Sequence, residues 1–419
     1  MENIQENKII IEIPKPPITA LVFEGGGVKG LAYSGAFQAL KQKNGLLDNV
    51  KWVAGSSAGA MTALMVALNY SPEEIEQELT EVDFSKFTDS QSNRLSAIFG
   101  YVTKLKNISS LHQGMHDGKE LYNWVKKIVK NKLNNELATF SDLQEKTNQS
   151  LDYKNLFIIV TNASKNKTEI FSYETTPRLQ LADAVLVSMS IPGYFWTRYL
   201  DEDEMQRIDW EPTKEKINKK THRLIPYVDG GVLNNYPVEI FSDRQYWLPE
   251  YYGLAKTHNY NPSIIGFRVD SKTEVDFLIE EHNKVLKEDT SFPIQEGPMQ
   301  YIEDKISSLL QFFTSDLNKI EQFSRVTIGI KDCDVKTTDF KLTREKKAEL
   351  KEEGKKAAQD FYNKFLKENV YKKIIYNNLS DLEDDYKKIE SLIQTIRKLN
   401  SKDRHFYELI IPVLELKIN

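Results

Sequence analysis

Short apolar runs alternate with helical stretches over residues 18–70. The apolar runs 18–23 and 50–54 predict strands, and the stretches 31–41 and 58–69 predict helices. Strand, helix, strand, helix is the order of a parallel sheet, because a parallel connection needs a crossover, usually a helix. The expected fold class is therefore α/β.

The same alternation continues along the chain with longer connections. Further strands are expected at 156–161, 168–173, 224–228, 264–269 and 325–330. Further helices are expected at 119–132, 181–189, 274–286, 301–323 and 343–368. Residues 71–118 are polar and irregular, so we interpret them as a lid, a variable insertion or a plain connection.

The end of the chain carries a helical pattern of its own. Apolar residues recur there at gaps of four, three, four and three, at Leu382, Tyr386, Ile389, Ile393 and Ile396. Such a stripe packs on a core, dimerises or lies on a membrane, and packing is the default expectation. We therefore divide the chain into an N-terminal segment (1–16), a main α/β domain (17–370) and a C-terminal helical extension (371–419).

Charge and cysteine content narrow the class of protein. The 419 residues include 56 Lys and Arg against 61 Asp and Glu, a net charge of −5, which gives no general attraction to nucleic acid or anionic membranes. Cys333 is the single cysteine, so an intramolecular disulfide is excluded and a reducing compartment is favoured. No apolar run approaches the length of a membrane span, and residues 1–17 do not resemble a secretory signal. A cytoplasmic or peripheral membrane protein is expected.

Gly55-Ser56-Ser57-Ala58-Gly59 fits the pattern G-x-S-x-G between a predicted strand and a predicted helix. This is the context of a nucleophile elbow, where a tight reversal exposes the serine. Small neighbours are needed at such a turn, and Gly55, Ala58 and Gly59 provide them. The alternative is a Gly/Ser turn that only caps a helix. Ser57 is the candidate nucleophile.

A glycine-rich segment follows the first predicted strand and opens a helix. Gly25, Gly27 and Gly30 fit G-x-G-x-x-G, which alone would suggest a dinucleotide site. That reading needs an acidic residue at the end of the second strand, where this chain has Ala54. A phosphate-binding P-loop would need Lys and then Ser or Thr after its last glycine. Here Gly30 is followed by Leu31 and Ala32 instead.

The same backbone suits an oxyanion hole, because no side chain blocks the approach to glycine N–H groups. The candidate donors are Gly25, Gly26, Gly27 and Ala58, with Gly26 and Gly27 foremost. Lys29 either adds positive charge or is solvated, and solvation is the expectation. Close packing of helix on strand explains Gly30 better than catalysis does.

Asp229 ends the apolar run 224–228 and precedes Gly230 and Gly231. Strand ends collect catalytic groups in parallel sheets, and a carboxylate can take a serine proton directly if its pKa is raised. The alternative is an Asp-Gly-Gly hairpin turn. No histidine is placed after Asp229 behind a strand, so we expect all six at the surface: His112, His116, His222, His258, His282 and His405.

These three motifs, in this order, resemble those of the patatin-like phospholipase family. Ser188–Pro192 and Asn234–Pro237 resemble two further family stretches, and the resemblance covers about residues 17–370. It implies a three-layer α/β/α sandwich with a mainly parallel central sheet. It also implies a Ser57–Asp229 dyad, a glycine-loop oxyanion hole, and no metal or other cofactor.

The activity implied is hydrolysis of fatty-acyl esters of phospholipids or lysophospholipids through an acyl-enzyme. The alternatives are a neutral-lipid or general carboxylesterase on the same dyad, and a lipid-binding member with little activity. We expect an acyl-ester lipid as substrate, peripheral contact with a membrane, and no binding of nucleic acid. Two possibilities stay open: a homo-oligomer formed through the C-terminal helices, and delivery as a secreted effector without a Sec signal. Three apolar clusters are candidates for an acyl pocket: 98–102, 194–196 and 309–313.

Overall fold

The computed structural model describes residues 9–82, 116–201, 208–209, 224–247, 260–288, 319, 322–337, 339, 341–367 and 370–376. The chain forms two compact units. The larger comprises Ile18–Val238 and Ile264–Tyr362, and the smaller comprises Met1–Pro17, Glu239–Ser263 and Asn363–Asn419.

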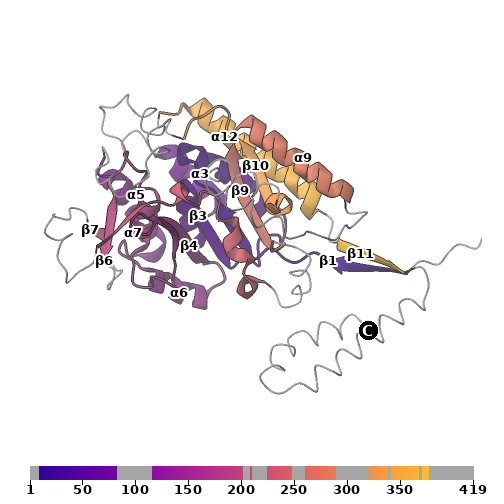
Figure 1. The fold of residues 1–419 in the computed structure, drawn as a ribbon, viewed down its shortest axis with the longest axis horizontal. Helices are drawn as coiled ribbons and strands as arrows, with labels where there is room; N and C mark the ends of the chain where they lie inside the picture. The colour runs from indigo at the N-terminus through magenta and orange to yellow at the C-terminus, as the bar shows by residue number, and fades with distance from the viewer. Residues whose placement is uncertain are drawn as a thin grey trace, which may run out of the picture. The chain divides into compact units, whose positions relative to one another are not determined.

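The larger unit is built on one mixed sheet (Figure 1). Its strands are β2 (Ala20–Phe23), β3 (Trp52–Ser56), β4 (Asn155–Asn162), β5 (Lys167–Phe171), β6 (Arg198–Asp201), β7 (Ile208–Asp209), β8 (Leu224–Asp229), β9 (Ile264–Asp270) and β10 (Thr327–Lys331). They lie in the order β10-β9-β2-β3-β4-β8-β6-β7, with β5 also paired to β4. The five strands from β10 to β4 are parallel, and the pairings of β5, β6, β7 and β8 are antiparallel.

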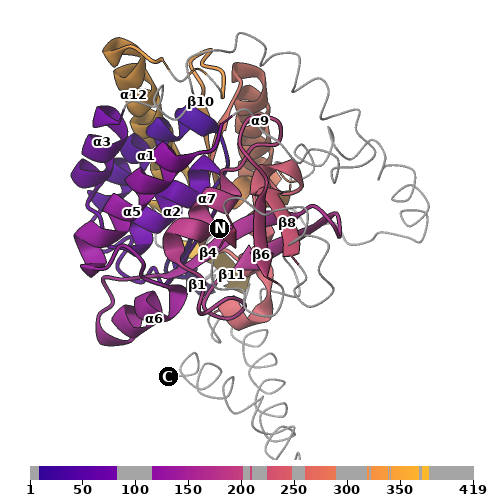
Figure 2. The same ribbon diagram turned by 90° about the vertical axis from the view of Figure 1, so that its left-hand side faces the viewer.

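Helices flank this sheet, as an apolar sheet with two faces requires. They are α1 (Leu31–Lys41), α2 (Ala58–Ala67), α3 (Pro72–Glu81), α5 (Lys119–Leu133), α6 (Phe140–Gln149), α7 (Leu181–Ser188), α9 (Lys272–Glu288) and α12 (Arg344–Phe361). Short helical turns occur at Gly27–Gly30, Gly230–Val232, Val238–Ser242, Arg244–Tyr246, Ser324–Val326 and Tyr362–Leu366. Figure 1 shows α9 and α12 beside β9 and β10, and Figure 2 shows α1, α2, α3 and α5 grouped together.

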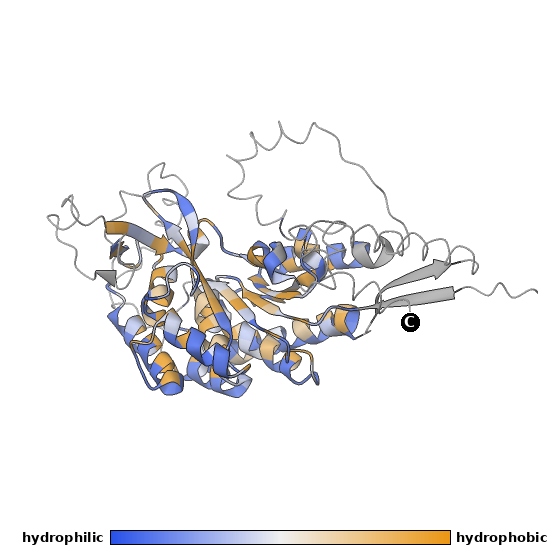
Figure 3. Ribbon diagram, turned by 90° about the horizontal axis from the view of Figure 1, so that it is seen from below, coloured by the Kyte–Doolittle hydropathy of each residue, from blue (hydrophilic) through white to orange (hydrophobic). Residues whose placement is uncertain are grey.

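The core lies where the parallel strands are covered by helices. Every residue of β2 and β9 is buried, and so is every residue of α2. Figure 3 shows strands coloured largely as hydrophobic beside helices of mixed hydrophobic and hydrophilic colouring. The α/β class and the mainly parallel sheet are therefore confirmed.

The smaller unit contains an antiparallel pair, β1 (Ile9–Pro14) with β11 (Val370–Tyr376). Neither strand is predicted from the sequence, and residues 371–376 are strand rather than the expected helix. Within Glu239–Ser263, the Asn261 side-chain amide donates to the carbonyl oxygens of Phe241 and Tyr246. The apolar stripe at 382–396 lies outside the described residues.

Several other expectations are corrected by the structure. Helix α3 occupies part of the stretch expected to be irregular, and a Ser71–Glu74 capping box begins it. Helix α6 begins at the corresponding Thr139–Asp142 box, which the sequence interpretation overlooked. Residues 83–115 of the expected lid or insertion, and most of the expected helix at 301–323, lie outside the described residues.

Candidate active site

Ser57 lies at the sharp turn between β3 and α2. Its backbone has φ 51° and ψ −123°, a strained conformation for a residue with a side chain. The turn needs glycine at Gly59, because a Cβ there would clash with the carbonyl oxygen of Phe23 at the end of β2. The elbow expected from G-x-S-x-G is therefore present in this structure.

Asp229 is within hydrogen-bond distance of this serine. The Ser57 hydroxyl donates to Asp229 Oδ2 at 2.7 Å, and the Gly231 N–H donates to Oδ1 at 2.7 Å. The two residues are 7% and 4% exposed. Burial raises the pKa of Asp229 from 3.8 to about 7, against the two hydrogen bonds, which lower it. A carboxylate with this pKa can accept a proton near neutral pH.

The strand that carries Asp229 runs against the direction that we expected. Strand β8 is antiparallel to β4, so Asp229 does not share the carboxyl edge of a parallel pair. It still meets Ser57 because β8 overlaps only the end of β4. Asp229 is opposite Val160, one residue beyond Ile159, which is opposite Ser56. Strands β3 and β8, which run in opposite directions, therefore end at nearly the same level of β4.

Ser188 forms two hydrogen bonds that fix the position of the elbow. Its hydroxyl accepts the Ser57 N–H at 2.9 Å and donates to the Ile159 carbonyl oxygen at 2.6 Å. Ser188 is fully buried at the end of α7. The Ser57 N–H is therefore already bonded, and Ser188 emerges as a positioning residue. The sequence resemblance pointed to its stretch but gave it no role.

The glycine loop runs directly beside Ser57. A Cβ placed on Gly25 would lie 3.1 Å from the Ser57 Cβ. The Gly25 N–H donates to the Asn235 carbonyl oxygen at 3.0 Å, and the Asn235 side chain donates back to the Gly25 carbonyl oxygen at 2.9 Å. The N–H groups of Gly26 and Gly27 have no hydrogen-bond partner among the residues that the structure describes.

Charged side chains anchor both ends of this loop. Lys29 forms an ion pair with Asp332 at 2.9 Å, and its side chain is 14% exposed, so the expectation that Lys29 is solvated is wrong. At the other end, Glu24 is buried and ion-paired with Arg268 of β9 at 3.4 Å. Arg268 also pairs with Asp270 at 2.8 Å. Sequence reasoning missed this group because nothing local pairs residues about 245 positions apart.

An apolar pocket opens beside the serine. It has about 590 Å³ of empty space, part of it open to solvent. Its lining comes from the glycine loop, the elbow, helices α1, α2, α3 and α5, and the segment after α7: Gly27, Val28, Gly30, Leu31, Ser57, Ala58, Met61, Thr62, Leu79, Leu121, Trp124, Met189, Ile191 and Phe195. Of the three expected clusters, 194–196 contributes Phe195, and 98–102 and 309–313 lie outside the described residues.

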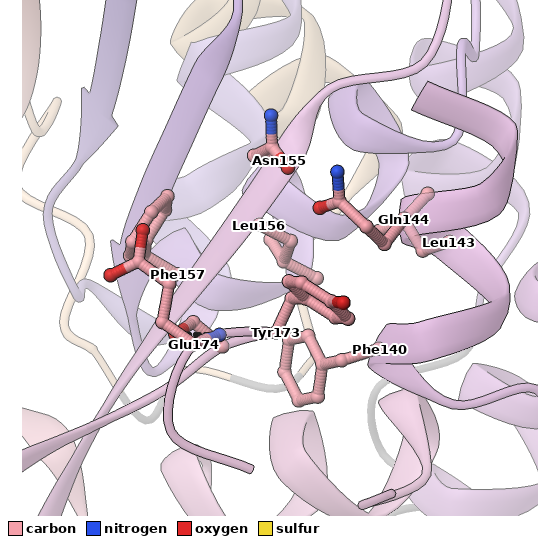
Figure 4. A pocket seen from close by; sticks show the side chains of 9 residues that line it. Phe140, Leu143, Gln144, Asn155, Leu156, Phe157, Tyr173 and Glu174 are labelled. Atoms are coloured by element: carbon pink, nitrogen blue, oxygen red, sulfur yellow. Dashed lines mark hydrogen bonds between the residues drawn. The ribbon is translucent and has the colours of Figure 1, made fainter. Parts of the chain in front are cut away.

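A second, smaller pocket lies elsewhere on the same sheet (Figure 4). The side chains of Phe140, Leu156 and Tyr173 converge in it, with Gln144 and Asn155 at its rim. It adjoins the beginning of β4, whereas Ser57 lies near the level of Val160, four residues or about 13 Å further along from Leu156. This pocket is separate from the serine.

Two histidines differ from their expected surface positions. His116 and His282 are 3% and 5% exposed. The His116 ring packs on the Tyr194 ring, and the backbone N–H of His116 donates to the Tyr194 carbonyl oxygen. His282 bonds the carbonyl oxygen of Ser324. The other four lie outside the described residues.

The described part of the chain contains no group of three His, Cys, Asp or Glu side chains arranged to hold a metal ion. None of its helices has both the length and the apolar character needed to cross a membrane.

Comparisons with known proteins show which family this chain is similar to. The family model described as patatin-like phospholipase matches residues 21–242, more than half of the chain. YqhO of Bacillus subtilis is 31% identical over 228 residues, covering 54% of this chain and 67% of that protein. The "probable lipid hydrolase 463L" of invertebrate iridescent virus 6 is 25% identical over 220 residues, covering 52% of this chain and 62% of that protein. The chain thus matches about two thirds of the length of these relatives.

Among solved structures, VipD from Legionella pneumophila is similar with a TM-score of 0.47 and 19% identity, covering 90% of this chain and 70% of that chain. The mixed sheet, the elbow and the family match define an α/β protein with a patatin-type domain. The chain belongs to the patatin-like phospholipase family.

Proposed function

We propose that this protein hydrolyses fatty-acyl esters of phospholipids or lysophospholipids, with Ser57 as nucleophile and Asp229 as general base. The observation that carries the proposal is the 2.7 Å hydrogen bond from the Ser57 hydroxyl to Asp229, together with an apolar pocket that Ser57 lines. Both groups are buried, and burial raises the pKa of Asp229 to about 7. A direct proton transfer between them needs no third residue.

In the first half-reaction, Asp229 takes the Ser57 proton as Ser57 Oγ bonds to the ester carbonyl carbon. The carbonyl oxygen becomes an oxyanion, which accepts hydrogen bonds from the N–H groups of Gly26, Gly27 and Ala58. We leave Gly25 out of this set because its N–H is bonded to Asn235. The ester C–O bond then breaks, and Asp229 returns the proton to the leaving alcohol.

In the second half-reaction, Asp229 removes a proton from water, whose oxygen attacks the acyl-enzyme carbonyl. The tetrahedral intermediate forms against the same N–H groups. It collapses with loss of Ser57 Oγ, which regains the proton from Asp229, and the fatty acid is released. One carboxylate therefore serves as base and then as acid in both steps.

The pocket supports a lipid acyl chain as the group transferred. It begins at Ser57 and Ala58 and continues along one face of α2 past Met61, about one helical turn further. Its lining is apolar apart from the backbone, the hydroxyls of Ser57 and Thr62, and the indole N–H of Trp124. Peripheral contact with a membrane is part of the proposal, because a phospholipid chain must enter this pocket from a lipid surface.

The test is release of fatty acid from mixed phospholipid and lysophospholipid vesicles by wild type, Ser57→Ala and Asp229→Asn. We expect activity in the wild type and loss of at least about 10³-fold in both variants. Labelling by a serine-directed fluorophosphonate should disappear in Ser57→Ala. Full activity in Asp229→Asn would refute the dyad.

Two further assays, with short soluble esters and by vesicle flotation, separate the alternative functions. A general carboxylesterase would hydrolyse short soluble esters and leave vesicles intact. A lipid-binding member would bind vesicles in a flotation assay without releasing fatty acid.

A further inference from the structure

The glycine loop is held from both sides by residues far away in the sequence. On one side, Asn235 makes two hydrogen bonds with Gly25, through its carbonyl oxygen and its side-chain amide. On the other side, the Val28 N–H donates to the Thr337 carbonyl oxygen at 3.3 Å. The Lys29 ammonium also pairs with Asp332 at 2.9 Å. Gly26 and Gly27, the proposed oxyanion donors, lie between these attachments.

The turn 332–337 fits closely against the loop. Gly27 has a φ of +57°, and a Cβ there would clash with the carbonyl oxygen of Thr337. The side chains of Lys29 and Asp332 are 14% and 15% exposed. Water and salt screen such a pair less than they screen a fully exposed pair.

The turn is itself fixed to the end of the sheet. Asp332 directly follows β10, and its N–H donates to the Asp270 carbonyl oxygen at 2.9 Å. Within the turn, the Val335 N–H donates to the Asp332 carbonyl oxygen, and the Asp334 N–H donates to Asp332 Oδ1 at 3.1 Å. Val335 is buried beneath it. The turn is therefore a firm support for the loop.

We propose that Asp332 and the turn 332–337 are positioning elements that hold the glycine loop ready to bind the oxyanion. The proposal rests on the proposed function, which gives Gly26 and Gly27 their role. Donors that are fixed before the reaction need no reorganisation when charge develops on the carbonyl oxygen. The family model ends at residue 242, so this support comes from a part of the chain beyond the family match.

The experiment compares Asp332→Asn, Lys29→Met and the double variant with wild type on a soluble acyl ester. Asn keeps an oxygen for the Asp334 N–H but loses the charge that binds Lys29. We expect kcat to fall about tenfold or more with KM changed less than twofold, because loss of a single oxyanion donor costs about 10²–10³-fold. Inhibition by a trifluoromethyl ketone, whose adduct carries an oxyanion, should weaken in parallel, whereas binding of the fatty-acid product should not.

The control is Asp276→Asn of α9, whose half-exposed carboxylate pairs with Lys331 at 3.8 Å and lies outside the turn 332–337, with an expected wild-type kcat. Thermal unfolding followed by circular dichroism checks that each variant is folded. If the Lys29–Asp332 pair acts as one unit, the double variant loses no more than either single variant. If Asp332→Asn does not fold, the exchange Lys29→Asp with Asp332→Lys should recover kcat above that of Lys29→Asp alone.

Three results would overturn the proposal. One is a wild-type kcat and inhibitor affinity in folded Asp332→Asn. Another is a kcat in the double variant that falls by the product of the two single losses. The third is an exchanged pair whose kcat does not rise above that of Lys29→Asp alone. Failure of the proposed function would look different, because the wild-type protein itself would show no turnover. In that case Gly26 and Gly27 would lose their role as oxyanion donors.

Discussion

At the scale of single residues, the proposed role of Asp229 makes activity depend on the protonation of its carboxyl group. Burial raises its pKa to about 7, and only the ionised carboxylate can accept the Ser57 proton. We therefore expect kcat/KM on a soluble ester to fall as pH drops below about 7, with one apparent pKa near that value. The measurement is a pH profile of kcat/KM between pH 5 and 9. A profile that stays flat down to pH 5 would mean a base with an ordinary carboxyl pKa.

The same burial predicts an effect of Asp229 on stability. A carboxyl group whose pKa is higher in the folded than in the unfolded state binds protons more tightly when folded. Its favourable contribution is complete below about pH 4 and is lost as pH rises to about 7. Each tenfold change in proton affinity is worth about 1.4 kcal/mol, so the loss approaches about 4 kcal/mol. Asp229→Asn should thus be more stable than wild type in urea unfolding at pH 8, and this advantage should vanish near pH 4.

Ser188 gives a third prediction at this scale. Ser188→Ala removes the acceptor for the Ser57 N–H and the donor for the Ile159 carbonyl oxygen, both buried. We expect a loss of about 1–3 kcal/mol of unfolding free energy and a kcat loss of about tenfold or more, because the strained elbow is no longer fixed. The control is Ser34→Ala, a buried serine whose hydroxyl donates to the Leu31 carbonyl oxygen in its own helix at 2.8 Å. A similar stability loss in both variants with unchanged kcat in Ser188→Ala would remove the positioning role.

At the scale of elements, helices α3 and α5 decide what the apolar pocket can hold. They contribute Leu79, Leu121 and Trp124, while α2 contributes the face next to the serine. Trp124 is held by its indole N–H, which donates to Glu78 of α3 at 3.4 Å. An ion pair from Lys127 to Glu78 joins the same two helices. The two helices flank the undescribed residues 83–115, where our expectation of a lid or insertion stays a prediction.

Trp124→Ala should change which acyl chains the enzyme prefers. Removing the indole opens space in the pocket, so longer chains gain contacts that shorter chains cannot make. We expect the ratio of kcat/KM for a sixteen-carbon over an eight-carbon ester to rise about tenfold, or about 1.4 kcal/mol, roughly two buried methylene groups. The control is Asn123→Ala on the exposed side of α5. An unchanged chain-length profile would mean that the acyl chain does not reach α5.

At the scale of the whole molecule, local patterns of the sequence predict the parallel half of the fold well. The predicted helix at 31–41 coincides with α1, and the strands of the βαβα unit agree within two residues. The elbow and the glycine loop are equally local, so Ser57 and the loop could be placed from the sequence. Three other features could not be predicted from the sequence: the direction of β8, the ion pair of Asp332 with Lys29, and the burial of His116. Each depends on contacts between segments that are distant in the chain.

The buried group of Glu24, Arg268 and Asp270 is the clearest such long-range contact. It joins the end of β2 to β9, so it forms only when strands far apart in the chain pair side by side. Arg268 is 1% exposed, and Arg268→Met would remove the guanidinium group that pairs with both buried carboxylates. We expect this substitution to lower the unfolding free energy by about 3–5 kcal/mol in urea denaturation. Lys127→Met, which breaks an ion pair at an exposed lysine, should lower it by about 1 kcal/mol or less. Equal losses in the two variants would mean that the buried group does not stabilise the pairing of β2 with β9.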